Sequence, residues 1–193
     1  MNTTLVVILI IVAALFVWFV SIYNNLIHMI EAVRNNQKQI DIQLDRRFKV
    51  FESLIEVVKK YMDYEQSTLS KVVALRSKAV AASNAGDEKT RIEAENGISK
   101  IASGLNIVFE QYPDLKANQN ALQLQEEIVN TENKLAFAKQ ALNDSIERYN
   151  ATKKSLFESF VVALVPSKLD QNFVYWQLSE QTVADQEKYT VKL

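Results

Sequence analysis

Residues 33–80 read VRNNQKQIDIQLDRRFKVFESLIEVVKKYMDYEQSTLSKVVALRSKAV, and this stretch decides the fold class. Its apolar residues recur at alternating steps of three and four, the period of one face of an α-helix. They are Val33, Ile40, Leu44, Phe48, Phe51, Ile55, Val58, Met62, Leu69, Val72 and Ala79. A helix with so long an apolar stripe is unstable alone in water, so we expect the downstream chain to pack against it.

Turn signals divide the chain into helices. The sequence Ser-Asn-Ala-Gly-Asp at 83–87 is the first stop signal, and Gly86 suits the position that follows a helix. Tyr112 and Pro113 end the next helix, because the residue before a proline disfavours the α region. Pro166 ends the last one. The predicted helices lie at about residues 24–84, 88–112 and 118–165.

The predicted fold is all-α, with an antiparallel bundle of three long helices in a domain that spans residues 23–165. Glycine and proline are scarce, with Gly 3 and Pro 2, which argues against a sheet-rich fold. The C-terminal tail, residues 166–193, carries the apolar cluster Phe-Val-Tyr-Trp at 173–176. An exposed cluster of this kind invites aggregation, so we expect the tail to pack on the bundle.

Two helix starts have candidate caps. Asp87 competes with a capping box that begins at Thr90 for the start of the second helix. Asn118 and Asn120 are the alternatives for the third helix.

An apolar run precedes the bundle. Residues 5–20 are apolar without a break, and a helix over 5–22 spans about 27 Å, close to the hydrocarbon core of a bilayer. A buried core helix is the alternative, but it would normally show a polar edge. Trp18 and Tyr23 lie towards one end, where amphipathic rings favour the membrane interface. We therefore expect a short tail at 1–4 and a single transmembrane helix in the lipid bilayer at 5–22.

The residues on either side of the 5–22 helix predict whether it is cleaved off and which way the chain crosses the membrane. Residues 1–4 carry no basic side chain and no small-residue cleavage site follows the run, so we expect the anchor to be retained. The basic residues follow it: Arg34, Lys38, Arg46, Arg47 and Lys49. The positive-inside rule then places the bulk of the chain in the cytoplasm.

The composition favours no catalytic or nucleic-acid-binding class. Basic and acidic residues number 22 and 23, and cysteine is absent. His28 is the single histidine, which we interpret as an interfacial or packing residue. Glu126, Glu127 and Glu132 form an acidic cluster without a histidine, so a solvated helix face is the expected role. We predict no catalytic residue, no cofactor, no metal site and no nucleic-acid partner.

A polar group interrupts the apolar seam at Asp41, Asp45, Arg46 and Arg47. Either aspartate could pair with an arginine within the bundle or on a sister chain, since both signs are balanced locally. A structural salt-bridge network is the favoured interpretation. The alternative is a site that binds an anionic partner.

Motifs in one order along the chain resemble those of the LemA family of bacterial membrane proteins. The matching segments are Tyr23-Asn24-Asn25-Leu26, residues 39–47 (QIDIQLDRR), residues 57–61 (VVKKY), residues 112–118 (YPDLKAN), residues 124–128 (LQEEI), residues 131–134 (TENK) and Tyr149-Asn150. Residues 49–55 lack the proline usual in the family, so the first helix is expected to be straighter. The resemblance implies a single-pass anchor in the bacterial inner membrane and a helical bundle, and it implies no reaction.

Two functions fit these features. The first is a non-enzymatic, membrane-anchored scaffold that self-associates into a homo-oligomer. The second is a monomeric adaptor that binds another membrane or signalling protein. Extra apolar positions beside the main seam favour the scaffold, because a three-helix bundle buries only one stripe of each helix. The expected self-association stripe is Leu54, Val57, Tyr61, Val73 and Val80.

Overall fold

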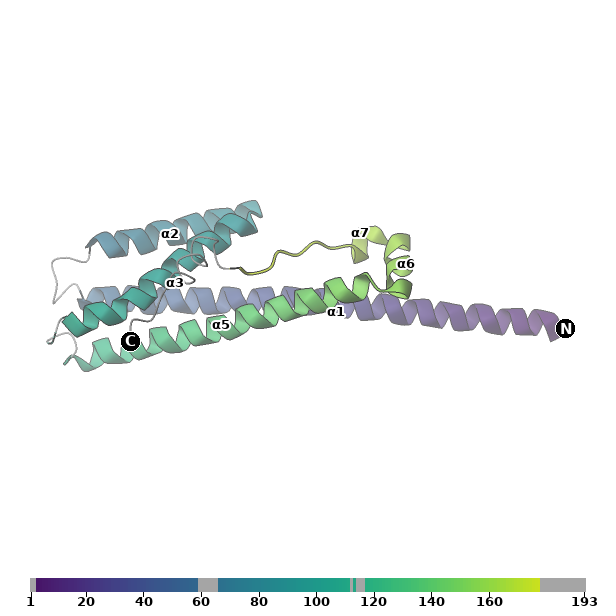
Figure 1. Ribbon diagram of the computed structural model, residues 1–193, viewed down its shortest axis with the longest axis horizontal. Helices are drawn as coiled ribbons and strands as arrows, with labels where there is room; N and C mark the ends of the chain where they lie inside the picture. Colours follow the sequence, from purple (N-terminus) through teal and green to yellow (C-terminus); the bar gives the residue numbers. More distant parts are fainter. Residues whose placement is uncertain (1–2, 59–65, 112, 114–116, 178–193) are drawn as a thin grey trace, which may run out of the picture. The chain divides into compact units, whose positions relative to one another are not determined.

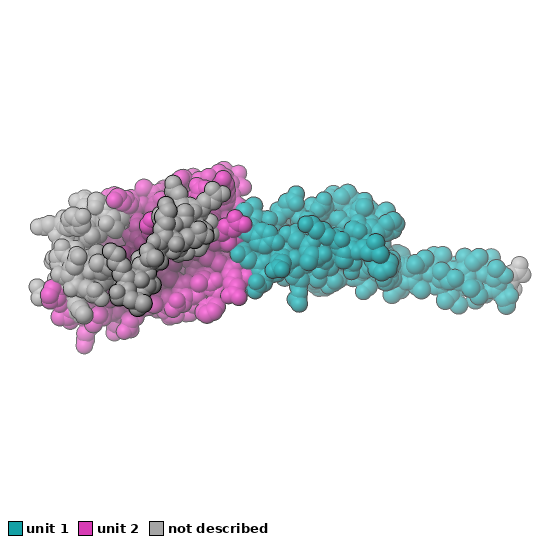
Figure 2. Space-filling model, viewed as in Figure 1, with its two compact units in different colours: residues 1–38, 141–175 teal, residues 39–140, 176–193 magenta. Residues whose placement is uncertain are grey.

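The computed structural model describes residues 3–58, 66–111, 113 and 117–177, and every regular element in them is a helix (Figure 1). The elements are α1 (Thr3–Val58), α2 (Gln66–Ala85), α3 (Glu88–Gln111), α5 (Gln119–Lys153), α6 (Leu156–Leu164) and α7 (Pro166–Leu169). The chain divides into two compact units (Figure 2). Unit 1 contains residues 1–38 and 141–175, and unit 2 contains residues 39–140 and 176–193. The predicted all-α class is confirmed.

The predicted first helix is two helices in the structure. The apolar period suggested one helix over 24–84, but α1 ends at Val58 and α2 begins at Gln66. The Arg76 guanidinium lies 5.4 Å from the centre of the Phe48 ring, so α2 folds back beside α1. Folding back lets the two halves of the apolar stripe bury each other, and this gain outweighs the weak local preference for a continuous helix. The connection, residues 59–65, lies outside the described residues.

Unit 2 has an apolar core to which four helices contribute. Its buried members are Phe51 and Leu54 of α1, Val72 of α2, Ile98 and Ala102 of α3, and Ala121 and Ile128 of α5. Helices α2 and α3 pack as a hairpin. Gly86 adopts a positive φ of 72° in its turn, with Gly86 N–H donating to Ser83 O and Asp87 N–H to Ala82 O. This is a Schellman C-cap, as the sequence predicts for Gly86.

The candidate caps are resolved by hydrogen bonds. The Asp87 carboxylate accepts from the Thr90 backbone N–H at 3.1 Å, so Asp87 rather than Thr90 caps α3. Hydrogen bonding to the Thr90 side chain, and then to its backbone N–H, holds the pKa of Asp87 below its ordinary value. The Asn118 side chain accepts from the Ala121 backbone N–H at 3.0 Å, so Asn118 caps α5.

Unit 1 packs the first part of α1 against the last part of α5, with α6, α7 and an extended segment after them. The predicted third helix, 118–165, is interrupted here: α5 ends at Lys153 and α6 begins after Ser155, whose backbone is extended. Ser155 is an ordinary N-cap residue, and its hydroxyl lies 2.7 Å from Glu158, so the sequence carries a start signal that apolar periodicity alone does not reveal. Pro166 begins α7 rather than following a helix directly.

Tyr149 ties the extended segment of unit 1 to α5. Its ring is fully buried, its hydroxyl donates to Leu169 O, and the Gln171 backbone N–H donates to the same hydroxyl at 2.8 Å. The Phe173 ring meets the Tyr149 ring edge to face at 5.5 Å. In unit 2, Trp176 is 7% exposed and donates to the Asn96 side chain at 3.2 Å. The tail therefore packs on the helices as predicted, as far as residue 177.

The N-terminal part of α1 is the one described segment long and apolar enough to cross a membrane. Its side chains are not the core of the chain, because Leu5 is 51% exposed and Val17 67% exposed. This removes the alternative of a buried core helix.

Candidate functional site

The predicted polar cluster lies in unit 2, and Arg47 is its buried member. Arg47 stands between Leu44 and Phe51 on the face of α1 that enters the core, and it is 1% exposed. Asp41, Asp45 and Arg46 are exposed around it. A fully buried guanidinium requires partners for its charge and its hydrogen-bond donors, and these come from helices far along the chain.

The partners of Arg47 lie on α3 and α5. Its guanidinium forms an ion pair with the buried Glu95 carboxylate and donates to Ser99 Oγ at 2.8 Å. Its Nη1 also lies 3.2 Å from Glu132 Oε1, and Ser99 Oγ donates to the other Glu132 oxygen at 3.0 Å. Glu95 and Ser99 are one turn apart on α3, so one arginine side chain joins three helices.

Arg76 brings α2 into the same group. Its Nη1 lies 3.4 Å from Glu95 Oε1, and its Nη2 lies 3.8 Å from Asp45 Oδ1. The guanidinium also covers the Phe48 ring, a cation–π contact. We call Arg47, Arg76, Glu95, Ser99 and Glu132 the Arg47 network.

The exposed members of the cluster pair separately around the network. Asp41 pairs with Arg91 of α3, Arg46 pairs with Glu127 of α5, and Asp45 lies 2.8 Å from Lys49. The hydrogen bond from Lys49 holds the pKa of the Asp45 carboxyl below its ordinary value. Every member of the predicted cluster thus has a partner in its own chain, so pairing with a sister chain is not needed to satisfy it.

Lys139 of α5 lies beside the network, and its surroundings disfavour its positive charge. Burial, together with the positive charge of Arg47, lowers the pKa of Lys139 from 10.5 to about 8, although Glu132 and Glu95 oppose the change. The ammonium nitrogen lies 4.8 Å from the centre of the Trp176 ring, which offers a cation–π contact. Lys139 is therefore a partly buried cation that the folded chain holds at some electrostatic cost.

Three residues of this network were missed by sequence reasoning, and one was misassigned. Glu132 was interpreted as part of a solvated face, but it contacts Arg47 and Ser99. Glu95 precedes Ile98 by three residues, so the helical period already places it on the apolar face of α3. No local pattern identifies Ser99 or Arg76 as its neighbours, because their pairing depends on how α2 and α3 fold back.

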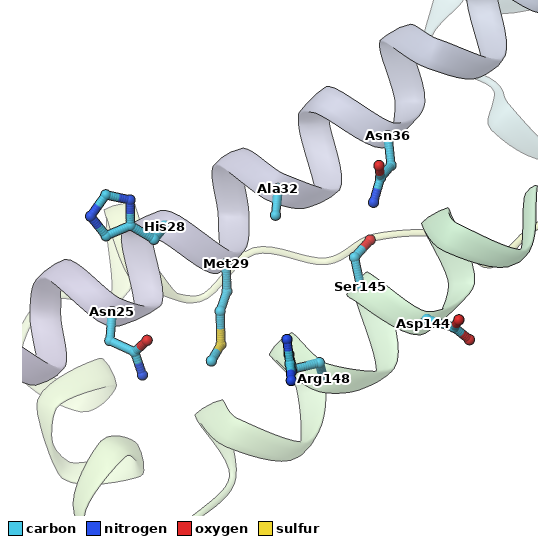
Figure 3. A pocket seen from close by; sticks show the side chains of 8 residues that line it. All are labelled: Asn25, His28, Met29, Ala32, Asn36, Asp144, Ser145 and Arg148. Carbon is cyan, nitrogen blue, oxygen red and sulfur yellow. The ribbon is translucent and has the colours of Figure 1, made fainter. Parts of the chain in front are cut away.

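Unit 1 contains an open pocket of about 590 Å³ between α1 and α5 (Figure 3). Its lining residues are Asn25, His28, Met29, Ala32, Asn36, Asp144, Ser145 and Arg148. Histidine, serine and aspartate together suggest nucleophilic catalysis, but their geometry does not. Figure 3 shows the His28 ring on the side of α1 turned away from α5, and Ser145 Oγ donates to Leu142 O at 2.7 Å. His28 is thus not placed to take a proton from Ser145.

The described residues include no group of three histidine, aspartate or glutamate side chains that could hold a metal ion. The two buried charges of the Arg47 network, Arg47 and Glu95, pair with each other, and each is 1% exposed. Chemically, this arrangement of buried, paired charges can hold the four helices in register.

The residues of the predicted self-association stripe do not share one exposed surface, because some are buried in the core of unit 2. Leu54 is 1% exposed in the core of unit 2, and Val57 packs partly against that core. Val73 and Val80 of α2 remain 44% and 43% exposed. Tyr61 lies outside the described residues. Of the predicted turn, Pro113 is exposed and its carbonyl accepts from Ala117 N–H at 2.9 Å, while Tyr112 also lies outside the described residues.

Comparison with known proteins gives one consistent result. The sequence model of the LemA family matches residues 36–187. Protein LemA of Metamycoplasma hominis is 32% identical over 159 residues, which is 81% of this chain and 69% of that protein. The family match covers every residue of the Arg47 network.

Proposed function

Because this chain belongs to the LemA family, we propose that it is a non-enzymatic scaffold, anchored in the bacterial cell membrane by α1, that self-associates into a homo-oligomer. The first part of α1 supplies the anchor, since residues 5–18 are apolar and helical and all of them except Val6 are exposed. The basic residues that follow the anchor favour a cytoplasmic location for the part of the chain after it.

The observation that supports self-association is that two helices of unit 2 carry exposed apolar side chains at a regular spacing. Val73 and Val80 are seven residues apart on α2, and Leu122 and Val129 are seven apart on α5. Residues at this spacing lie on one face of a helix, as in the seam of a coiled coil. All four are at least 37% exposed, and Phe137, eight residues after Val129, is 72% exposed.

Anchoring strengthens this argument. Chains held in one membrane are parallel and at high local concentration, so weak apolar contacts between them can suffice for assembly. A scaffold needs such stripes on its long helices, whereas an adaptor needs one compact apolar patch. The spacing on α2 and α5 fits the first requirement.

The absence of enzymatic activity in this proposal rests on side-chain geometry. The pocket of unit 1 brings His28, Asp144 and Ser145 together in its lining, but His28 faces away from α5. The buried carboxylates of unit 2 are paired with arginines and are closed to solvent.

The test is the mass of the full-length protein in lipid nanodiscs and in mild detergent, measured by mass photometry at micromolar concentration. The variant Val73→Glu/Val80→Glu places two charges in the α2 stripe and is expected to shift the protein towards a monomer. Ala74→Glu/Ala81→Glu is the matched control, because these exposed residues have the same spacing on the same helix, about 100° away. The control is expected to assemble like the parent.

A parent protein that is monodisperse and monomeric in both environments would contradict the scaffold and favour the adaptor. Equal loss of assembly in both variants would show that added charge alone, rather than the stripe, prevents association.

A further inference from the structure

Helix α6 carries an apolar face that the described residues leave more than half exposed. Its exposed side chains are Leu156 (79%), Phe157 (59%), Phe160 (64%) and Leu164 (58%). At about 100° per residue, these four fall within an arc of about 100° on the helix. Val161 faces the interior of unit 1 and is fully buried, and Glu158 lies on the side opposite the apolar face.

The position of α6 along α1 is fixed by an aromatic contact. The Phe157 ring meets the Trp18 ring edge to face, with 5.4 Å between the ring centres. Trp18 belongs to the apolar segment itself and lies four residues, or about 6 Å, before its end at Ile22. When α1 crosses a bilayer, α6 is therefore held at the depth of the interface.

The direction of α6 agrees with this position. Figure 1 shows α6 running across the axis of α1, not along it. A helix that crosses the axis of a transmembrane helix lies along the plane of the membrane. The exposed Lys154 precedes α6 and the exposed Lys168 follows it, as is common where a helix rests on lipid headgroups.

We propose that α6 is an interfacial membrane helix, which inserts the face formed by Leu156, Phe157, Phe160 and Leu164 into the bilayer beside the anchor. The occupant of this face is lipid, because the face continues the lipid-exposed surface of α1 at Trp18. The inference rests on the anchoring part of the proposed function and is independent of self-association. The full-length chain then contacts the membrane through two helices, one that crosses it and one that lies in its surface.

The chain has no cysteine, so single-cysteine variants of the full-length protein can be spin-labelled cleanly. Labels at Phe160→Cys and Leu164→Cys report on the α6 face, and a label at Leu9→Cys reports on the anchor. Ala141→Cys is the matched control, because this exposed residue of α5 belongs to the same unit and lies 12 residues before the end of that helix. The proteins are reconstituted in vesicles of phosphatidylcholine with one quarter phosphatidylglycerol.

The measurement is the accessibility of each label to oxygen, which partitions into lipid, and to a water-soluble nickel chelate. We expect the labels at Phe160→Cys, Leu164→Cys and Leu9→Cys to favour oxygen and to be several-fold less accessible to nickel than the label at Ala141→Cys. High nickel accessibility on α6 together with a lipid-exposed Leu9→Cys label would overturn the interfacial helix alone. Shielding of α6 from both reagents would overturn it in favour of a protein contact. An aqueous Leu9→Cys label would refute the anchor itself.

Discussion

The two units of this chain differ in the kind of polar group that they bury among their helices. Unit 2 buries charge: Arg47 and Glu95 are each 1% exposed, and Arg76 and Glu132 surround them. Unit 1 buries Tyr149, whose neutral hydroxyl bridges the backbone of Leu169 and Gln171. A buried charge must be matched by another charge, whereas a buried hydroxyl needs only hydrogen-bond partners. Unit 2 should therefore tolerate loss of one partner far less well than unit 1.

The largest effect is expected from Arg47→Ala. This change leaves Glu95 buried without its nearest cation, and breaking one side of a buried ion pair costs about 3–5 kcal/mol. Arg46→Ala is the control, because Arg46 pairs with Glu127 at the surface and such pairs contribute under ~1 kcal/mol. Urea denaturation followed by circular dichroism measures both. Equal destabilisation by the two variants would refute a structural role specific to the buried arginine.

In unit 1, Tyr149→Phe is expected to have a smaller effect. The change retains the ring contact with Phe173 but leaves Leu169 O and Gln171 N–H without their partner, at a cost of about 1–3 kcal/mol. Hydrogen exchange resolved by peptide should show faster exchange in 141–175 with unit 2 little changed. Faster exchange throughout the chain would show that the two units do not respond separately.

Lys139→Met tests the electrostatic cost within unit 2. The pKa of Lys139 is lowered to about 8 on folding, so between pH 8 and 10.5 the unfolded chain holds a proton that the folded chain has released. This group therefore makes stability rise with pH in that window and opposes folding below it. We expect Lys139→Met to raise stability at pH 7 by roughly 1–2 kcal/mol and to remove this rise. A variant that is less stable at pH 7 would mean that the contact with Trp176 outweighs the burial of charge.

The smallest effect is expected at the turn between α2 and α3. Gly86→Ala places a side chain at a φ of 72°, which costs about 1 kcal/mol relative to glycine although no atom lies within 4 Å of the added Cβ. A thermal melt should shift by a few degrees, and the change in hydrogen exchange should be confined to unit 2. Gly86→Asn is the control and should be milder, because asparagine tolerates this conformation better.

Sequence reasoning succeeded where a short stretch contains the whole signal. The helical apolar run at 5–22 and the Gly86 C-cap each depend on neighbours within a few residues, and the second helix was predicted at 88–112 and observed at Glu88–Gln111. For the N-cap of α5 the sequence narrowed the choice to Asn118 and Asn120, and the hydrogen bond to Ala121 N–H selects Asn118. Whether residues 33–80 form one helix or two could not be predicted from short stretches of sequence. Their apolar periodicity is the same whether the two halves form one helix or pack against each other, and only tertiary burial decides between them.

The same distinction applies to the polar cluster. Its four residues stand out in the sequence because they interrupt an apolar seam. Their roles differ, since Arg47 is buried and the other three are exposed, and that difference follows from which face of α1 meets α3 and α5. Glu95 was detectable from its own helical period, but its pairing with Arg47 spans 48 residues of chain, which no local rule reaches.

The buried guanidinium also affects the alternatives that the chain must avoid. Apolar side chains are nearly interchangeable in contact, so a stripe of them permits several similar packings of α1 against α3 and α5. A shift of α1 by one residue turns its side chains by about 100° and takes Arg47 away from Glu95, Ser99 and Glu132 together. Each misaligned packing then contains an unmatched charge in a region of low dielectric, and its free energy rises steeply. The arginine thus widens the energy gap between the native alignment and its near neighbours, which uniform apolar packing would leave narrow.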